Sequence, residues 1–144
     1  MPHANTSTDS GAVIFFDGVC GLCNRFINSL LRADHGRKIR FSPLQGEAFS
    51  ELVKRHPELA SIDSMVLWEH DSEGEHLWLY SDASLRAWEL LGGGRATLAR
   101  TARLVPRPIR NFVYRCVAVI RYRIFGKSDV CRVPTPAERE RFLD

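Results

Sequence analysis

The sequence predicts an α/β fold in which helices pack on a sheet, and three observations support this class. The apolar run at 12–16 has the length of a buried strand. Directly after it, apolar residues recur at helical spacing over 23–31. Farther along, two β-prone runs flank Asp71-Ser72-Glu73-Gly74, a turn sequence typical of a hairpin. A chain of 144 residues with this pattern is expected to form one layered domain.

Proline, glycine and serine mark the boundaries of the other elements. Gly36 is suited to end the first helix, and Pro57 stops the helical pattern that begins at Glu47. Ser81 is a good N-cap for the next helix, which three glycines at 92–94 end. In chain order we expect strands at 12–16, 38–44, 65–68 and 77–80, and helices at 20–35, 47–56, 81–91, 96–104 and 109–120.

This order of strands and helices is that of a thioredoxin-like domain. We therefore expect a four-stranded mixed sheet flanked by helices, with the later helices forming a C-terminal helical extension at about 95–127. The single domain is expected to span 11–144, after a disordered N-terminal lead-in at 1–10. In an open α/β sheet the functional site lies beyond the carboxyl ends of the strands, here after the first strand.

Hydropathy and cysteine content indicate the cellular compartment of the protein. No apolar run reaches the roughly 18 residues of a membrane span, and residues 1–10 lack the apolar core of a secretory signal. Four cysteines without an export signal indicate a reducing compartment, so we expect a cytoplasmic protein. In such a compartment a close cysteine pair is more often redox-active or metal-binding than structural.

The segment Cys20-Gly21-Leu22-Cys23 places two cysteines where the first strand gives way to the first helix. A helix start presents free N–H groups and a partial positive charge, and both favour a thiolate. This layout predicts a lowered thiol pKa for Cys20, which makes it the nucleophile. Cys23, one helical turn further on, is the predicted resolving thiol that releases a mixed disulfide.

Asp17 precedes Cys20 by three residues, at the end of a predicted buried strand. Burial raises a carboxyl pKa, which suits Asp17 to accept a proton from Cys23 during resolution. The structural alternative is a turn or capping carboxylate that fixes the loop. The five histidines show no ligand spacing and a second Cys-x-x-Cys is absent, so we expect no metal and no bound cofactor.

The sequence strongly resembles the DCC family, thiol-disulfide oxidoreductases named for an Asp-x-x-Cys-x-x-Cys motif. Here the motif reads Asp17-Gly18-Val19-Cys20-Gly21-Leu22-Cys23, and the resemblance runs over about 13–143. It implies a thioredoxin-like fold and exchange with thiol or disulfide substrates, either proteins or small molecules such as glutathione. The other segments that carry it are Phe41-Ser42-Pro43-Leu44-Gln45, Asp63-Ser64-Met65-Val66-Leu67, Tyr80-Ser81-Asp82-Ala83-Ser84-Leu85 and Arg121-Tyr122-Arg123-Ile124-Phe125-Gly126-Lys127 with Cys131 and Pro134.

Two further segments are predicted to bind the substrate. By analogy with glutathione transferases and glutaredoxins, Ser81 and Asp82 at a helix start line the substrate groove. Simple N-capping is the alternative for this pair. Ser64 and Met65 stand where thioredoxins carry a cis-proline before the third strand, and we expect them to border the same groove. Without that proline, substrates need not dock as they do on thioredoxin.

The C-terminal half is basic, because 90–128 holds no Asp or Glu but many arginines. This segment is either a site for an anionic partner or a solvated helix face. No nucleic-acid motif is visible, so no nucleic-acid partner is expected. Cys116 lies on an apolar stripe and is expected to be a buried, inert thiol. Cys131, in a predicted loop, is expected to have a packing role, and a third redox thiol is the alternative.

The rival to an oxidoreductase is a non-enzymatic thioredoxin-like binding module, which keeps the fold and uses the groove for a protein partner. The sequence leaves open the substrate, the direction of electron flow and the oligomeric state.

Overall fold

The computed structural model describes residues 11–18, 21–35, 38–62, 64–71, 73–125 and 141–143. The predicted nucleophile Cys20, the thiol Cys131 and the N-terminal lead-in at 1–10 lie outside these described residues. The described elements are β1 (Gly11–Phe16), α1 (Gly21–Ala33), β2 (Ile39–Pro43), α2 (Glu47–Arg55), the 3-10 helix η1 (Pro57–Ser61), β3 (Val66–Asp71), β4 (Gly74–Leu79), α3 (Tyr80–Leu91), α4 (Gly93–Ala102) and α5 (Arg107–Phe125).

The strands form one sheet in the order β2-β1-β3-β4. β1 pairs with β2 in parallel, and β1 with β3 and β3 with β4 in antiparallel fashion. The predicted four-stranded mixed sheet is therefore confirmed, and so is the C-terminal run of helices. Parallel β1 and β2 need a crossover, which α1 supplies, whereas β3 and β4 form the predicted hairpin.

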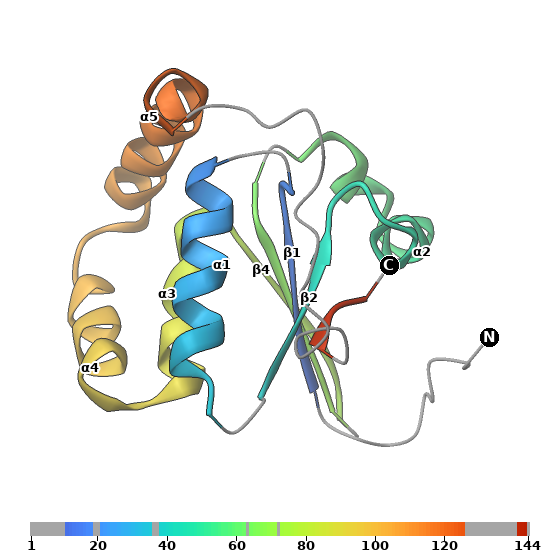
Figure 1. Cartoon of the computed structure of the whole chain (residues 1–144), viewed down its shortest axis with the longest axis horizontal. Coiled ribbons are helices and arrows are strands. Elements are labelled where there is room, and N and C mark those ends of the chain that lie inside the picture. Colours follow the sequence, from blue (N-terminus) through green and yellow to red (C-terminus); the bar gives the residue numbers. More distant parts are fainter. Residues whose placement is uncertain are drawn as a thin grey trace.

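Helices cover both faces of the sheet (Figure 1). α1 and α3 lie on one face, α2 lies on the other, and α4 and α5 form a further layer beyond α1 and α3. β1 alternates between the two cores, because Ile14 packs toward Ile27 of α1 while Phe15 packs toward Phe49 of α2. Both faces of β1 are covered, which is why its residues 12–16 are all buried and apolar.

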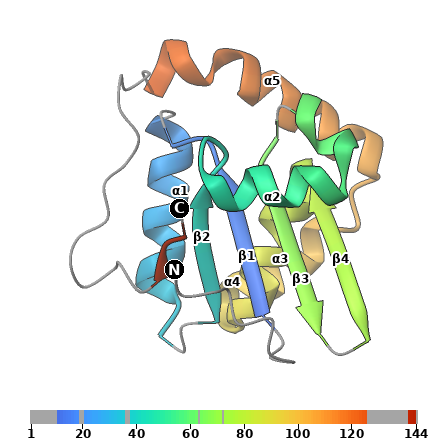
Figure 2. The same cartoon turned by 90° about the vertical axis from the view of Figure 1, so that its right-hand side faces the viewer.

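α5 crosses the end of the sheet at which β1 and β2 finish (Figure 2). It contacts α1 and α3, and the Tyr114 hydroxyl of α5 accepts a hydrogen bond from the Met65 N–H at 3.0 Å. α5 therefore closes one side of the region where the functional site is expected. Among the described residues, no helix is both long and apolar enough to cross a bilayer.

Residues near the C-terminus return to the free edge of β2. The Leu143 N–H donates to the Phe41 carbonyl at 2.7 Å, and Phe142 forms an isolated parallel bridge with Phe41. The Phe142 ring also lies 6.3 Å from the ring of Phe16, edge to face. This contact anchors residues 141–143 to the core on which β1 and α1 pack.

The start of α3 differs from the prediction. α3 begins at Tyr80, and the residue before it, Leu79, makes no side-chain capping bond. Ser81 lies inside the helix, so its assignment as N-cap is wrong. The chain turns instead at Tyr80, whose φ is 54°, and the Ser64 hydroxyl accepts the Tyr80 N–H at 2.7 Å. The N–H at the start of α3 is thus satisfied by Ser64, from a loop 16 positions earlier, and not by a capping side chain next to the helix.

The expectation that Cys116 is buried is also wrong, because its side chain is exposed. The apolar stripe of α5 to which it belongs faces solvent rather than the core. The side of α5 that packs on the domain carries polar groups instead, among them Arg110, Asn111 and Tyr114, each bonded to a residue outside α5.

Candidate functional site

Cys23 is the third residue of α1 and is half-buried at the carboxyl end of β1. The first turn of α1 contains no acidic residue, so no carboxylate within the helix offsets the positive end of its dipole. Cys20 directly precedes Gly21, the first residue of α1, but its own placement is outside the described residues. The helix start predicted from the motif is therefore confirmed, whereas the geometry of the cysteine pair stays a prediction.

Asp17 follows the last residue of β1 and is buried, with 8% of its surface exposed. Its Oδ1 accepts a hydrogen bond from the side-chain amide of Gln45 at 3.0 Å. The Oε1 of the same amide accepts the Gly18 N–H at 3.3 Å. Gln45 therefore spans two neighbouring groups of the loop after β1 and fixes the carboxylate of Asp17 relative to the backbone.

Two more contacts hold the loop that leads into α1. The Leu44 N–H donates to the Phe16 carbonyl at 2.7 Å, which joins the exit of β2 to the exit of β1. The side-chain amide of Asn24 donates to the Gly18 carbonyl at 3.1 Å, which joins the first turn of α1 to the same loop. The backbone on either side of Asp17 is thus held by β2 and by α1, a precondition for orienting a reacting group.

A cavity of about 460 Å³ opens beside Cys23. Side chains of α1, α3 and α5 line it together with Met65, and its walls are largely apolar, with Phe26, Leu85 and Val113 as examples. Its polar lining groups include Ser81, Arg110 and Tyr114. A mostly apolar cavity with a few polar groups is the usual form of a small-molecule or peptide-side-chain site.

Of the predicted site residues, Cys23, Met65 and Ser81 line this cavity together. Ser64 and Asp82 are not among its described lining residues. Ser64 is buried, and its hydroxyl donates to the Met65 carbonyl at 2.7 Å while it accepts the Tyr80 N–H. The Ser64–Met65 segment is therefore held from the start of α3 by Ser64 and from α5 by Tyr114.

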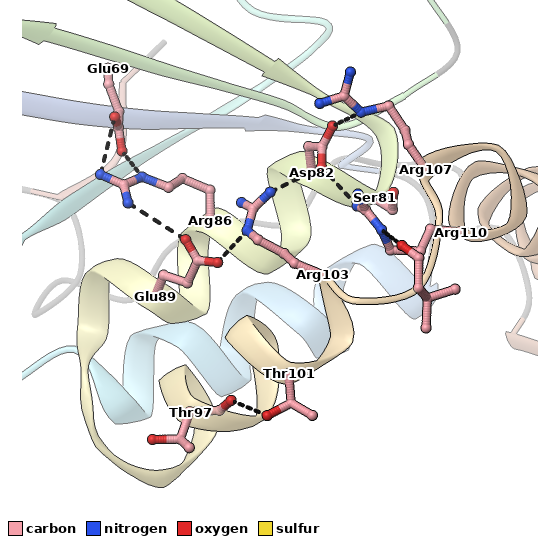
Figure 3. A network of polar contacts seen from close by, with 11 residues as sticks. Glu69, Ser81, Asp82, Arg86, Glu89, Thr97, Thr101, Arg103, Arg107 and Arg110 are labelled. Carbon is pink, nitrogen blue, oxygen red and sulfur yellow. Dashed lines mark hydrogen bonds and ion pairs between the residues drawn. The ribbon is translucent and has the colours of Figure 1, made fainter.

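Asp82 is the centre of an ion-pair network between α3 and the helices that follow (Figure 3). Arg110 approaches its Oδ1 at 2.7 Å, Arg107 its Oδ2 at 3.0 Å and Arg103 its Oδ1 at 3.2 Å. Burial raises the pKa of the Asp82 carboxyl, but the hydrogen bond from Arg110 and the charges of the three arginines outweigh burial and hold the pKa below its usual range.

Ser81 belongs to the same network. Its hydroxyl donates to Asn111 Oδ1 at 2.6 Å and accepts from the guanidinium of Arg110 at 3.1 Å. Arg110 thus contacts both adjacent residues of α3 and also lines the cavity. Within the described part of the chain, no cluster of three or more His, Cys, Asp and Glu side chains is placed to hold a metal ion.

Sequence reasoning missed three residues of this region. No local pattern reveals the role of Gln45, because its contact with Asp17 joins residues 28 positions apart. Arg110 is one of many arginines in the basic segment 90–128, and its pairing with Asp82 also spans 28 positions. The sequence around Tyr114 gives no sign of its role, because its hydroxyl accepts the N–H of Met65, 49 positions away.

The fold and the site together define a class. A thioredoxin-like sheet carries, at the carboxyl end of β1, a buried aspartate, a cysteine in the first turn of α1 and an adjoining apolar cavity. The profile of the DCC1-like thiol-disulfide oxidoreductases matches residues 14–127, and the chain belongs to this family.

Two relatives cover most of the chain. The uncharacterized protein YuxK of Bacillus subtilis is 35% identical over 133 residues, which make up 91% of this chain and 93% of YuxK. A chloroplastic DCC family protein of Arabidopsis thaliana is 35% identical over 126 residues, which make up 87% of this chain and 71% of that protein. No solved structure matches the chain.

Proposed function

We propose that this protein is a thiol-disulfide oxidoreductase that works through Cys20 and Cys23. The observation that carries the proposal is the position of Cys23, in the first turn of α1 and on the wall of an apolar cavity. Membership of the DCC1-like family supports the same chemistry. The substrates are thiols or disulfides, carried by proteins or by small molecules such as glutathione.

In the proposed reaction, the Cys20 thiolate attacks one sulfur of a substrate disulfide. A mixed disulfide forms, and the other substrate sulfur leaves as a thiolate. Cys23 then loses its proton and attacks the Cys20 sulfur, which releases the second substrate thiol and leaves a Cys20–Cys23 disulfide. Two electrons pass from the cysteine pair to the substrate. An external thiol reductant, or the reverse reaction with a substrate dithiol, restores the reduced pair.

Asp17 is the proposed acceptor of the Cys23 proton, and Gln45 is the residue that positions it. The support is that the Asp17 carboxylate is buried at the end of β1 and bonded by the Gln45 amide, and that the next residue, Gly18, is bonded by Asn24 of α1. A buried carboxylate near a thiol is suited to general-base work.

The proposed substrate groove is bordered by residues that contact the substrate and by residues that hold the groove walls. These residues are Ser64, Met65, Ser81 and Asp82. Met65 and Ser81 line the cavity, so they are proposed to contact the substrate. Ser64 holds the Met65 segment and Asp82 holds α5 through Arg110, so these two are proposed to shape the groove walls.

A mixed-disulfide trap tests this function. Replacing the resolving thiol, Cys23→Ser, is expected to leave substrates covalently attached to Cys20 when the protein is recovered from cells and resolved without reductant. The trap is best made with Cys116→Ser and Cys131→Ser, because Cys116 is exposed and either remaining thiol could form disulfides of its own. The matched control adds Cys20→Ser and is expected to retain no covalent partner. An empty trap under oxidative stress contradicts the proposal.

The same preparation separates an enzyme from a binding module. A binding module keeps its partner without a covalent bond and is indifferent to Cys20→Ser. An oxidoreductase loses its partner with that change, and its Cys20–Cys23 disulfide forms and reduces reversibly.

A further inference from the structure

The outer face of α5 is apolar and exposed. We call the residues that form it the α5 stripe: Ile109, Phe112, Val113, Cys116, Val119 and Ile120. They recur at intervals of three and four residues, so they lie along one face of the helix. Phe112 is 67% exposed and Val119 is 79% exposed. Leu104, just before α5, is 83% exposed and extends the same apolar character. Soluble monomers rarely leave so many large apolar side chains together in water.

Specific contacts on the opposite face of α5 fix this orientation. Arg110 pairs with Asp82, Asn111 accepts from Ser81 and the Tyr114 hydroxyl accepts the Met65 N–H. Turning the α5 stripe inward would break all three contacts and leave the buried carboxylate of Asp82 without Arg110. The stripe is therefore presented to solvent by the fold itself.

The surroundings of the α5 stripe are positively charged. Exposed arginines lie on α4 and α5, and the sequence has no Asp or Glu between 90 and 128 to offset them. Arg103, Arg107 and Arg110 share the single carboxylate of Asp82, so the exposed arginines still give this surface an excess of positive charge. These exposed arginines are Arg95, Arg100, Arg107, Arg115 and Arg123.

We propose that α5 docks this protein on the surface of anionic membranes. An interfacial helix needs a long apolar face and basic residues beside it. The α5 stripe supplies the apolar face over residues 109–120, and exposed arginines of α5 such as Arg115 and Arg123 supply the positive charge. The apolar side chains enter the boundary between headgroups and acyl chains, and the arginines bind anionic headgroups. The helix lies in the plane of the surface and does not span the bilayer.

Charge distinguishes this occupant from a second copy of the chain. A symmetric dimer through the α5 stripe would bring together two copies of the same arginine-rich surface, which lacks Asp and Glu between 90 and 128. Like charges brought together in an interface oppose association. An anionic lipid surface instead complements the arginines and the stripe at the same time.

Docking in this way also orients the candidate site. Ile109 and Val113 belong to the α5 stripe and line the cavity beside Cys23. The cavity therefore borders the surface that meets the lipid when the stripe is bound, and docking brings the candidate site close to thiols or disulfides held at the membrane.

Vesicle flotation with the full chain, under reducing conditions, tests the proposal. We expect the protein to float with vesicles of phosphatidylcholine and phosphatidylglycerol but to bind pure phosphatidylcholine at least about tenfold more weakly, because the arginines then lose their counter-charge. Added salt is expected to weaken the binding. F112S/V119S removes two exposed apolar contacts and is expected to lower partitioning at least about tenfold without unfolding the protein.

A charge-matched pair of variants completes the test. R123E in α5 is expected to lower partitioning about tenfold or more. R32E changes the net charge equally, but Arg32 is exposed in the last turn of α1, away from the α5 stripe, so binding should persist. Equal binding to both vesicle types, equal loss in R123E and R32E, or a dimer that F112S/V119S dissociates with no vesicle binding would each overturn the proposal.

Discussion

The side-chain amide of Gln45 donates a hydrogen bond to Oδ1 of Asp17 across 3.0 Å, from the exit of β2 to the exit of β1. The oxygen of that amide is occupied by the Gly18 N–H, so the amide cannot rotate without losing both bonds. Asp17 is consequently held at one orientation at the start of the loop that leads to Cys23. The proposed proton acceptor is thus placed by a residue from another strand.

Removing that support should slow the proposed chemistry without removing Asp17. Gln45→Leu is expected to lower the rate of disulfide reduction roughly tenfold, because a misplaced base loses effective concentration toward the thiol. The measurement is single-turnover reduction of a disulfide substrate, followed with pH. Ser50→Ala in α2 is the control, because its hydroxyl contacts only the Gly46 carbonyl nearby, and the rate should be unchanged. Equal rates for Gln45→Leu and the parent protein would argue against this positioning role.

Replacing Asp17 itself should affect one step more than the other. Asp17→Asn keeps the shape and can still bond Gln45, but it cannot accept a proton. We expect resolution of the mixed disulfide to slow roughly 100-fold, while its formation by Cys20 slows far less. Stopped-flow kinetics with a chromogenic disulfide separates the two phases. If both phases keep their rates and only the melting temperature falls, Asp17 is a structural carboxylate.

Asp82 should control stability in a pH-dependent way. Its folded-state pKa is lowered below the ordinary 3.8, so its contribution is fully present above that value and is lost as the pH falls through the folded-state pKa. Asp82→Asn is expected to cost about 2 kcal/mol of unfolding free energy at neutral pH, as expected for lost charge-assisted hydrogen bonds. The difference from the parent protein should shrink below about pH 4.

Urea unfolding at several pH values measures this dependence. Glu51→Gln is the control, because its pairing with Lys54 is exposed and should contribute nothing measurable. A destabilisation by Asp82→Asn that is the same at pH 3 and pH 7 would show that the arginines do not act through the charge of Asp82.

Tyr114 should connect α5 to the substrate groove. Tyr114→Phe leaves the Met65 N–H without its acceptor and is expected to cost about 1 kcal/mol of stability. It should also raise KM for disulfide substrates more than it lowers kcat, since it loosens a cavity wall rather than a reacting group. Tyr80→Phe is the matched control. It removes the hydroxyl of Tyr80, whose ring centroid lies 5.7 Å from that of Tyr114, and leaves the hydrogen bond between Tyr114 and Met65 intact. The idea fails if the two variants have the same KM.

Local patterns were enough to predict the elements of the sheet and the start of α1. The apolar run at 12–16, the Asp71-Ser72-Glu73-Gly74 turn and the cysteine spacing each act within a few residues, and each predicted its element. The order of the elements then restricted the fold to a thioredoxin-like sheet, because parallel strands need a crossover helix.

The errors have a common cause. Ser81 has the composition of an N-cap, yet Ser64 accepts the first N–H of α3 and the Ser81 hydroxyl binds Asn111. Cys116 lies on an apolar stripe, yet the polar contacts of Arg110 turn that stripe outward. In both cases a tertiary contact overrode a local preference, and such contacts cannot be inferred from the residues on one element.

The proposed reaction depends on the start of α1 holding Cys20 as a thiolate at neutral pH. Its most direct test is the pH dependence of Cys20 alkylation, measured by mass spectrometry in a C23S/C116S/C131S variant, so that one thiol titrates alone. We predict a Cys20 pKa well below the value of about 8.5 for an unperturbed thiol. A Cys20 thiol that titrates at or above about 8.5 would contradict the account.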